Sequence, residues 1–116
     1  MDSDKKPLYK SPSGIEVIEA TNRGDINTFK SDLHEDFLFI KDYQMQNREE
    51  YLEDLEELFK KNYKVNHPRV ILENQDLLVL NHEVSENSKR YLVTVVALRK
   101  DGRAWRIITN RRELKP

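Results

Sequence analysis

Residues 89–113, KRYLVTVVALRKDGRAWRIITNRRE, decide the fold class. Asp101-Gly102 separates two runs that are rich in β-branched residues. An Asp-Gly pair between two such runs is a strong hairpin signal, because both central turn positions require positive φ. If these two residues form the turn, facing positions have numbers that sum to 203. The sequence therefore predicts a long hairpin with strands at Lys89–Arg99 and Ala104–Glu113.

This register assigns every side chain of the hairpin to one of two faces. The first face would hold the facing pairs Leu98/Trp105, Val96/Ile107, Thr94/Thr109, Leu92/Arg111 and Arg90/Glu113. The second would hold the facing pairs Ala97/Arg106, Val95/Ile108, Val93/Asn110 and Tyr91/Arg112. The first face is the more apolar one, so we expect it to face the protein interior. The second face also carries apolar side chains and resembles a subunit interface, which predicts a homodimer through the outer sheet face.

The residues before the hairpin predict two more strands and three helices. The period is two in Tyr63–Glu73 and Leu77–Ser85, as expected for strands joined by short polar turns. In the second of these strands, either Asn81 or His82 could point inward.

Local signals mark the helix ends. Ser11-Pro12-Ser13 favours a first helix that ends at Gly24, and Asp25 can cap a second one. Asn47 with Glu50 resembles a capping box for a third helix, which follows a short strand at Phe37–Ile40. The sequence thus predicts an α+β fold with helices on one face of a curved, mainly antiparallel sheet. It also predicts a disordered arm at residues 1–10 and a single domain at residues 11–116.

Composition excludes several function classes. The 116 residues carry a net charge of −1 and include no cysteine and three glycines, so no thiolate chemistry and no glycine-rich phosphate loop is expected. The sequence has no apolar run of membrane-spanning length and no secretory leader, and we expect a cytoplasmic protein. The three histidines have no paired spacing, so we expect no metal and no other cofactor.

The near-zero net charge conceals a strong asymmetry. Residues 31–60 carry ten acids and three bases, whereas residues 89–115 carry nine bases and two acids. The basic segment suggests nucleic-acid binding, with Trp105 and Tyr91 available for stacking. However, the chain as a whole is not basic, and the predicted register places its arginines on both faces, so nucleic acid is not the expected partner.

Three motifs resemble the nuclear transport factor 2-like superfamily, and within it the SnoaL-like domains and the calmodulin-dependent kinase association domain. The first is Asn22-Arg23-Gly24-Asp25 with the apolar residues that follow it, and the second is Asn47-Arg48-Glu49-Glu50-Tyr51-Leu52. The third is Arg99–Ile108, in which Ala104 adds one residue to the more usual Asp-Gly-X-Trp pattern. The resemblance spans residues 13–114 and implies a cone-shaped domain that encloses a pocket and is commonly dimeric through its sheet.

The resemblance leaves enzyme activity open. Ketosteroid-type isomerases of this family have a general-base aspartate just after the first strand, where Asp42 stands here. The acidic donors that would hold an enolate oxygen are missing, because Thr94 stands roughly where a carboxylic acid would be needed. His82 is the other candidate base, because histidine titrates near neutrality.

We therefore expect an apolar pocket that binds a small organic molecule, without an assigned reaction. Its wall would be Trp105, Leu92, Val96 and Ile107, and its polar contacts would be Thr94, Thr109, Arg111 and His82. Arg111 favours an anionic ligand such as a carboxylate. Two alternatives stay open: an isomerase, dehydratase or cyclase that uses Asp42 or His82 as the base, and a protein-interaction module with a filled pocket.

Overall fold

The structure, a computed structural model, describes residues 9–115. The first half contains α1 (Gly14–Arg23), α2 (Ile26–Asp32), β1 (Leu33–Lys41), β2 (Gln44–Asn47) and α3 (Arg48–Lys60). The second half is a meander of β3 (Asn66–Glu73), β4 (Leu77–Glu86), β5 (Lys89–Lys100) and β6 (Arg103–Leu114). The strands form a six-stranded sheet in the order β2-β1-β6-β5-β4-β3, in which only the β1–β6 pair is parallel. The α+β prediction is confirmed.

The predicted helix ends are also confirmed. Ser13 and Asn47 begin α1 and α3 with complete capping boxes, and Asp25 caps α2. Gly24 ends α1 at a φ of 68°, a left-handed conformation that glycine adopts without steric cost. Local side-chain hydrogen bonds therefore set the boundaries of the helical half.

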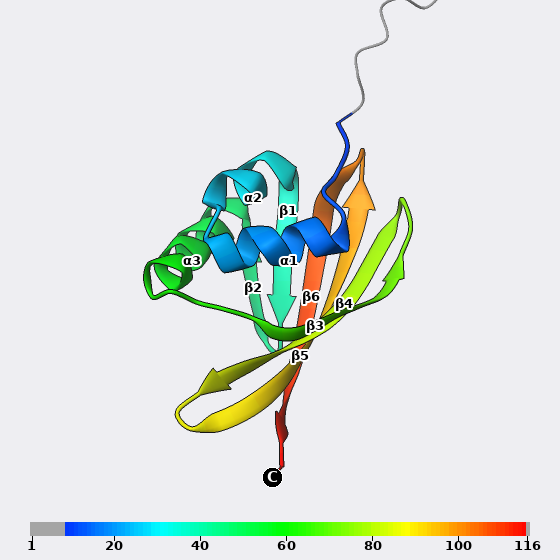
Figure 1. The fold of residues 1–116 in the computed structure, drawn as a ribbon. Helices are drawn as coiled ribbons and strands as arrows, with labels where there is room; N and C mark the ends of the chain where they lie inside the picture. The colour runs from blue at the N-terminus through cyan, green and yellow to red at the C-terminus, as the bar shows by residue number, and fades with distance from the viewer. Residues whose placement is uncertain (1–8, 116) are drawn as a thin grey trace, which may run out of the picture.

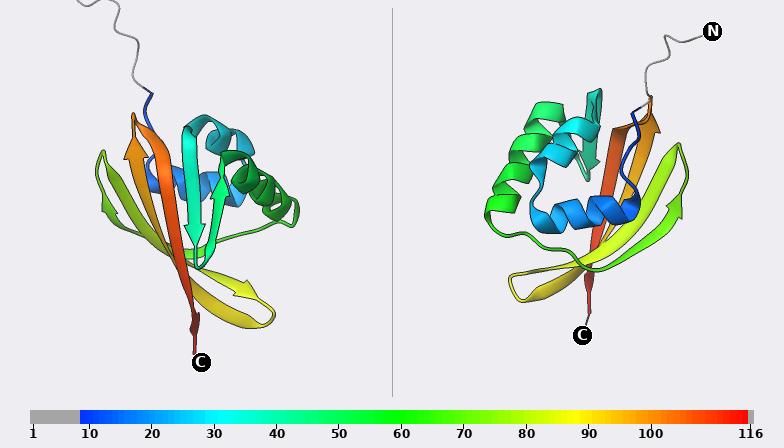
Figure 2. Two further views of the ribbon diagram at one scale, coloured as in Figure 1. Left: turned by 180° about the vertical axis from the view of Figure 1, so that it is seen from behind. Right: turned by 45° about the horizontal axis from the view of Figure 1, so that its top comes forward.

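The helices cover one face of the curved sheet, and they cover it incompletely (Figure 1). The β4–β5 hairpin and the end of β6 extend beyond the helices, as two further views show (Figure 2). Under the helices lies the main core, which includes Phe29, Leu52, Leu55, Leu80 and Ile107. The inner sheet face is thus divided into a part under the helices and a part beyond them.

The predicted register of the β5–β6 hairpin is correct only next to its turn. Arg99 faces Ala104 as expected, but Leu98 faces Arg106, so Trp105 is an extra residue in β6. From this β-bulge onward, facing positions sum to 204, so Ile107, Thr109 and Arg111 face the odd-numbered residues of β5 and not the even-numbered residues that the prediction placed opposite them. The bulge lies next to Arg99, whose side chain is on the inner face of the sheet. Its guanidinium is buried, donates to the Pro12 carbonyl at 3.1 Å and lies 3.6 Å from the Glu73 carboxylate.

The β4 strand resolves the choice between residues 81 and 82. Leu78, Leu80, His82 and Val84 are buried and alternate with half-buried residues. Leu78 and Leu80 belong to the main core, so His82 lies on the inner face and Asn81 on the outer one.

Two features were not predicted. The short polar strand β2 pairs with β1 and lengthens the sheet at one edge. The chain before α1 is also attached to the domain: Ser11 Oγ donates to buried Asp32 at 2.6 Å, and the Arg103 guanidinium stacks on the Tyr9 ring at 4.0 Å. Residues 1–8 of the predicted arm lie outside the described residues.

Candidate functional site

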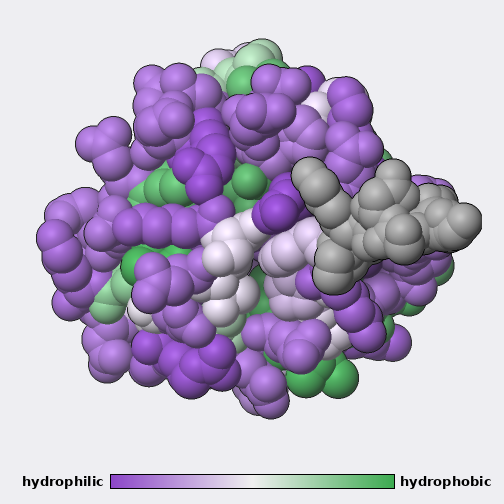
Figure 3. Space-filling model, turned by 90° about the horizontal axis from the view of Figure 1, so that it is seen from above, coloured by the Kyte–Doolittle hydropathy of each residue, from purple (hydrophilic) through white to green (hydrophobic). Residues whose placement is uncertain are grey.

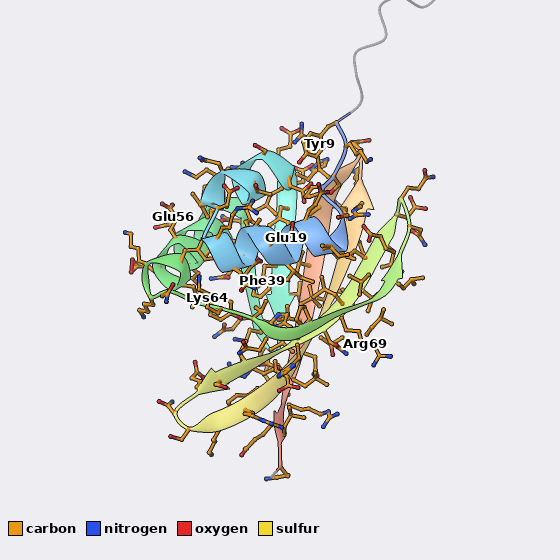
Figure 4. The ribbon with its side chains drawn as sticks, viewed as in Figure 1. Tyr9, Glu19, Phe39, Glu56, Lys64 and Arg69 are labelled. Atoms are coloured by element: carbon orange, nitrogen blue, oxygen red, sulfur yellow. The ribbon has the colours of Figure 1, made fainter. Side chains whose placement is uncertain are left out.

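The part of the inner face under the helices is filled by aromatic side chains. The Tyr51 ring packs between Phe37 and Phe39, with centroid distances of 5.0 and 4.6 Å. Burial raises the pKa of the Tyr51 hydroxyl strongly. Phe37 is 1% exposed, and Figure 4 shows Phe39 on the helix-covered side of the sheet. Phe37 belongs to the buried core here, and the partly buried rings of Phe39 and Tyr51 pack against that core.

The part beyond the helices is different, and we call it the distal inner face. It consists of the inner-face residues His82, Val84, Tyr91, Val93, Thr109 and Arg111. His82, Val93 and Arg111 form one cross-strand row, because His82 faces Val93 on β5 and Val93 faces Arg111 on β6. Polar groups at both ends of this row flank an apolar centre.

His82 is buried, and one of its ring nitrogens lacks a hydrogen bond to any described residue. The residue is 7% exposed, and its Nδ1 atom makes no hydrogen bond of normal geometry with any described residue. Burial lowers the pKa of the imidazole, and the nearby Glu83 backbone opposes this effect only in part. The ring is therefore neutral near pH 7, and its unpaired nitrogen is costly in free energy unless a partner is supplied.

Arg111, at the other end of the row, is held by two neighbours. Its guanidinium lies 3.9 Å from the Tyr91 ring centroid and donates to Glu86 Oε1 at 2.8 Å. The bond to Glu86 raises the pKa of Arg111 and lowers that of the Glu86 carboxyl. Burial raises the pKa of the Tyr63 hydroxyl, and the charges of Arg111 and Glu86 act on it in opposite directions. Tyr63 thus lies close to this ion pair.

The structure brings together only some of the predicted ligand contacts. Thr109, Arg111 and His82 lie on the inner face, and Ile107 lies there within the main core. Thr94, Leu92 and Val96 lie on the outer face, because the bulge at Trp105 shifts the register by one residue. Thr94 therefore faces Asn110 and cannot bond with Thr109 across the strands.

Trp105 is not part of the inner wall either. The Arg106 guanidinium stacks on its ring at 3.8 Å, and Lys100 Nζ lies 5.3 Å from the ring centroid. Arg106 faces Leu98, two positions before Lys100, so these cations lie on the outer side of the sheet. The predicted pocket wall is wrong at this position for the same reason as at Thr94.

Asp42 directly follows Lys41, the β1 residue that faces Thr109. It occupies the exposed turn between β1 and β2 with a φ of 52°. Within residues 9–115, no hydrogen bond or ion pair engages its carboxylate. Within the described residues, Asp42 makes no contact with His82, so the two candidate bases do not form one site.

Tyr63, Glu86 and Tyr91 lie beside Arg111 and are not among the residues that the sequence predicts as ligand contacts. The predicted register places Tyr91 on the outer face opposite Arg112, and Glu86 falls in the short polar turn after the predicted Leu77–Ser85 strand. The available signal was Ala104, the extra residue in the hairpin motif, which indicates a bulge. With the register shifted by one, Tyr91 and Arg111 fall on the same face.

Two hollows of the surface lie elsewhere. One, of about 600 Å³, lies between the Tyr9–Pro12 segment and helices α1 and α2. The other, of about 500 Å³, is lined by residues that include His34, Arg48, Asp101 and Arg103. The end of the molecule that carries the first hollow is predominantly polar (Figure 3). Neither hollow includes a predicted ligand contact.

Comparisons with known proteins define the fold class. No protein-family model matches the chain, and no curated protein matches it. Solved structures do match. One is an NTF2-like protein of unknown function from Cytophaga hutchinsonii (TM-score 0.72, 18% identity, 93% of this chain and 94% of that one).

Two further matches are proposed polyketide cyclases. The one from Sinorhizobium meliloti has a TM-score of 0.67 and 17% identity, with 80% of this chain and 88% of that chain covered. IdmH from Streptomyces antibioticus has a TM-score of 0.62 and 15% identity, with 82% and 86% covered. These likenesses show that the chain has the nuclear transport factor 2-like fold, which supports many unrelated functions. None of the helices in the described part of the chain is long and apolar enough to span a membrane.

Proposed function

We propose that this protein binds a small organic molecule on the distal inner face. The observation that carries the proposal is the buried Nδ1 of His82, which has no hydrogen-bond partner among residues 9–115 and lies in the same row as Arg111. A buried polar atom without a partner costs about 1–3 kcal/mol, and such atoms are rare in native proteins. A ligand that supplies the missing hydrogen bond removes this cost.

The other residues of the distal inner face are also suited to bind a small organic molecule. Arg111 can hold an anionic group, Thr109 supplies a hydroxyl, and Val93 and Val84 supply apolar contact. Two of the similar structures are proposed polyketide cyclases, a fold-level analogy that agrees with a small organic ligand.

The geometry favours binding over acid–base catalysis. A general base must stabilise its protonated form, and a histidine base is usually oriented by a carboxylate. The burial of His82 disfavours the charged imidazole, and no described carboxylate bonds to Nδ1. The isomerase, dehydratase or cyclase reading is thus the second choice, with His82 a better placed base than Asp42.

A screen by protein NMR tests the binding proposal. The full chain, labelled with ¹⁵N, is titrated with a library of small carboxylic acids and neutral organic compounds. We expect hits that shift the signals of His82, Val93 and Arg111. A library that moves none of these signals would refute the proposal.

A second role, homodimerisation through the outer sheet face, has support of its own. A row of six apolar residues crosses all six strands on that face: Leu72, Val79, Val96, Ile108, Ile40 and Met45. Met45, Leu72 and Ile108 are exposed in the single chain, and contiguous apolar rows of this kind are typical of interfaces. We propose that a second copy covers this row.

Light scattering coupled to size exclusion tests the dimer. The 13.9 kDa chain should elute with twice that mass at micromolar concentration. Ile108→Glu in the row should give monomers, whereas Ile15→Glu, an exposed position on α1, should not. A monomeric wild-type protein would contradict the proposal.

A further inference from the structure

The distal inner face restricts the chemistry of its ligand. We infer that the ligand is an amphipathic hydroxy carboxylic acid, whose hydroxyl binds Nδ1 of His82 and whose carboxylate replaces that of Glu86 on Arg111. This inference rests on the proposed function and adds the substrate class to it.

The spacing of the two polar ends limits the length of the ligand. His82 and Arg111 are separated by one intervening strand, so their Cα atoms lie on the order of 10 Å apart, twice the spacing between strands. Because the Arg111 guanidinium lies over the Tyr91 ring and meets Glu86, the side chains between it and His82 are those of Val93, Val84 and Tyr91. A ligand that reaches both ends needs two polar groups joined by an apolar body about as long as a phenyl ring with a short chain.

The protonation of the imidazole limits which ligand group can bind Nδ1 of His82. A neutral imidazole carries its proton on one nitrogen, so Nδ1 either accepts or donates a hydrogen bond. A hydroxyl satisfies both cases because it is a donor and an acceptor. A cationic amine suits this position less well, because burial already disfavours positive charge on the imidazole.

Arg111 already binds a carboxylate, that of Glu86, which a ligand carboxylate could replace. Glu86 ends β4, its side chain is 58% exposed, and the two turn residues after it, Asn87 and Ser88, have positive φ. An exposed ion pair contributes little stability, so a ligand carboxylate can replace Glu86 at low cost. The Tyr91 ring remains under the guanidinium and keeps it in place.

The charge of the surroundings favours a monoanion. Glu86 and Glu113 both lie near Arg111, with Glu113 facing Tyr91 in the next row. Lys89 reaches Glu113 only at 4.0 Å. A doubly charged phosphate would meet two carboxylates, the held guanidinium and Lys41, whose charge acts on Glu86. A carboxylate would exchange with one that is already bound.

Three matched probes test the inference on the full chain by calorimetry and NMR. They are 3-(4-hydroxyphenyl)propanoate, its analogue without the hydroxyl (3-phenylpropanoate), and its neutral amide. One hydrogen bond predicts about 2–10-fold weaker binding of the analogue without the hydroxyl. Loss of the charge-assisted contact predicts about 10–100-fold weaker binding of the amide. The His82 imidazole ¹⁵N signals should shift with the hydroxy acid and much less with 3-phenylpropanoate.

Three variants assign the two contacts. His82→Leu should bind both acids equally, and Arg111→Gln should bind acid and amide equally. Arg112→Gln, one residue further along the same strand and on the outer face, is the control and should keep both preferences. Glu86→Gln should tighten the binding of both acids about 2–5-fold without affecting the amide, a gain that misfolding cannot produce.

The outcomes separate the inference from the proposed function. If the three probes bind equally at the distal inner face, the ligand class is wrong and the binding site stands. If the preferences survive in both His82→Leu and Arg111→Gln, the two contacts are wrong. If no probe binds and the wider library moves no signal of the distal inner face, both proposals fail.

Discussion

The two parts of the inner sheet face use the same strands in opposite ways. Under the helices, Phe37, Phe39 and Tyr51 fill the space with packed rings. Beyond the helices, His82 is equally enclosed but has an unpaired nitrogen, and Arg111 is held by a partner at the surface. The first arrangement gains stability from burial, whereas the second gives up some stability and keeps polar groups available. Under the proposed function, folding depends on the first part and ligand binding on the second.

The largest expected effect is in the core. Phe37→Ala removes a ring that is 1% exposed, and we expect a loss of about 3–5 kcal/mol in the free energy of unfolding. Val93→Ala, in the half-buried centre of the distal row, should cost less than about 1.5 kcal/mol. Urea denaturation measures both. Equal losses would show that the two parts contribute alike to stability.

Two buried histidines provide the next test. His82 and His34 are both 7% exposed, but His34 Nδ1 accepts a hydrogen bond from the Asp36 N–H at 3.0 Å, and its Nε2 lies 3.5 Å from Asp101. His82→Leu removes an unpaired nitrogen and should stabilise the protein by about 1 kcal/mol, whereas His34→Leu leaves a backbone donor unpaired and should destabilise it by about 1–3 kcal/mol. Thermal or urea unfolding shows the sign. Destabilisation by both variants would mean that Nδ1 of His82 is satisfied.

The pH dependence of stability sharpens this comparison. Burial lowers the pKa of His82 in the folded state below the ordinary value of about 6.5, so the unfolded chain binds the extra proton first. The contribution of His82 is complete above pH 6.5 and is lost as the pH falls toward the folded-state pKa. The stability gap between His82→Leu and wild type should therefore widen between pH 7 and pH 5. A gap that does not change with pH would indicate an exposed imidazole.

The smallest effect on stability is expected at the distal ion pair. Glu86→Gln breaks a surface contact and should change the free energy of unfolding by less than about 1 kcal/mol. Its effect should appear instead in carboxylate binding. A large loss of stability would place Glu86 among the structural residues of the hairpin.

Sequence reasoning succeeded where the signals are local. The capping boxes at Ser13 and Asn47, the left-handed cap at Gly24 and the Asp101-Gly102 turn each depend on residues within one turn of chain. The α+β class followed from these elements and from the period of the strands.

The site was predicted less well because it depends on register. One extra residue at Trp105 changes which β5 and β6 side chains share a face, since side chains alternate along a strand. The bulge occurs next to Arg99, whose partners Pro12 and Glu73 are distant in sequence. The parallel pairing of β1 with β6 is also a non-local contact. Ile107, Thr109 and Arg111 lie on the inner face as predicted, whereas Thr94, Leu92, Val96 and Trp105 do not.

The most direct test of the ligand site is an NMR map of the full chain bound to its tightest hit from the library. We expect the largest changes at the imidazole nitrogens of His82 and at the amides of Val93, Thr109 and Arg111. Changes confined to the outer sheet face or to the two surface hollows, with the His82 nitrogens unmoved, would contradict the account.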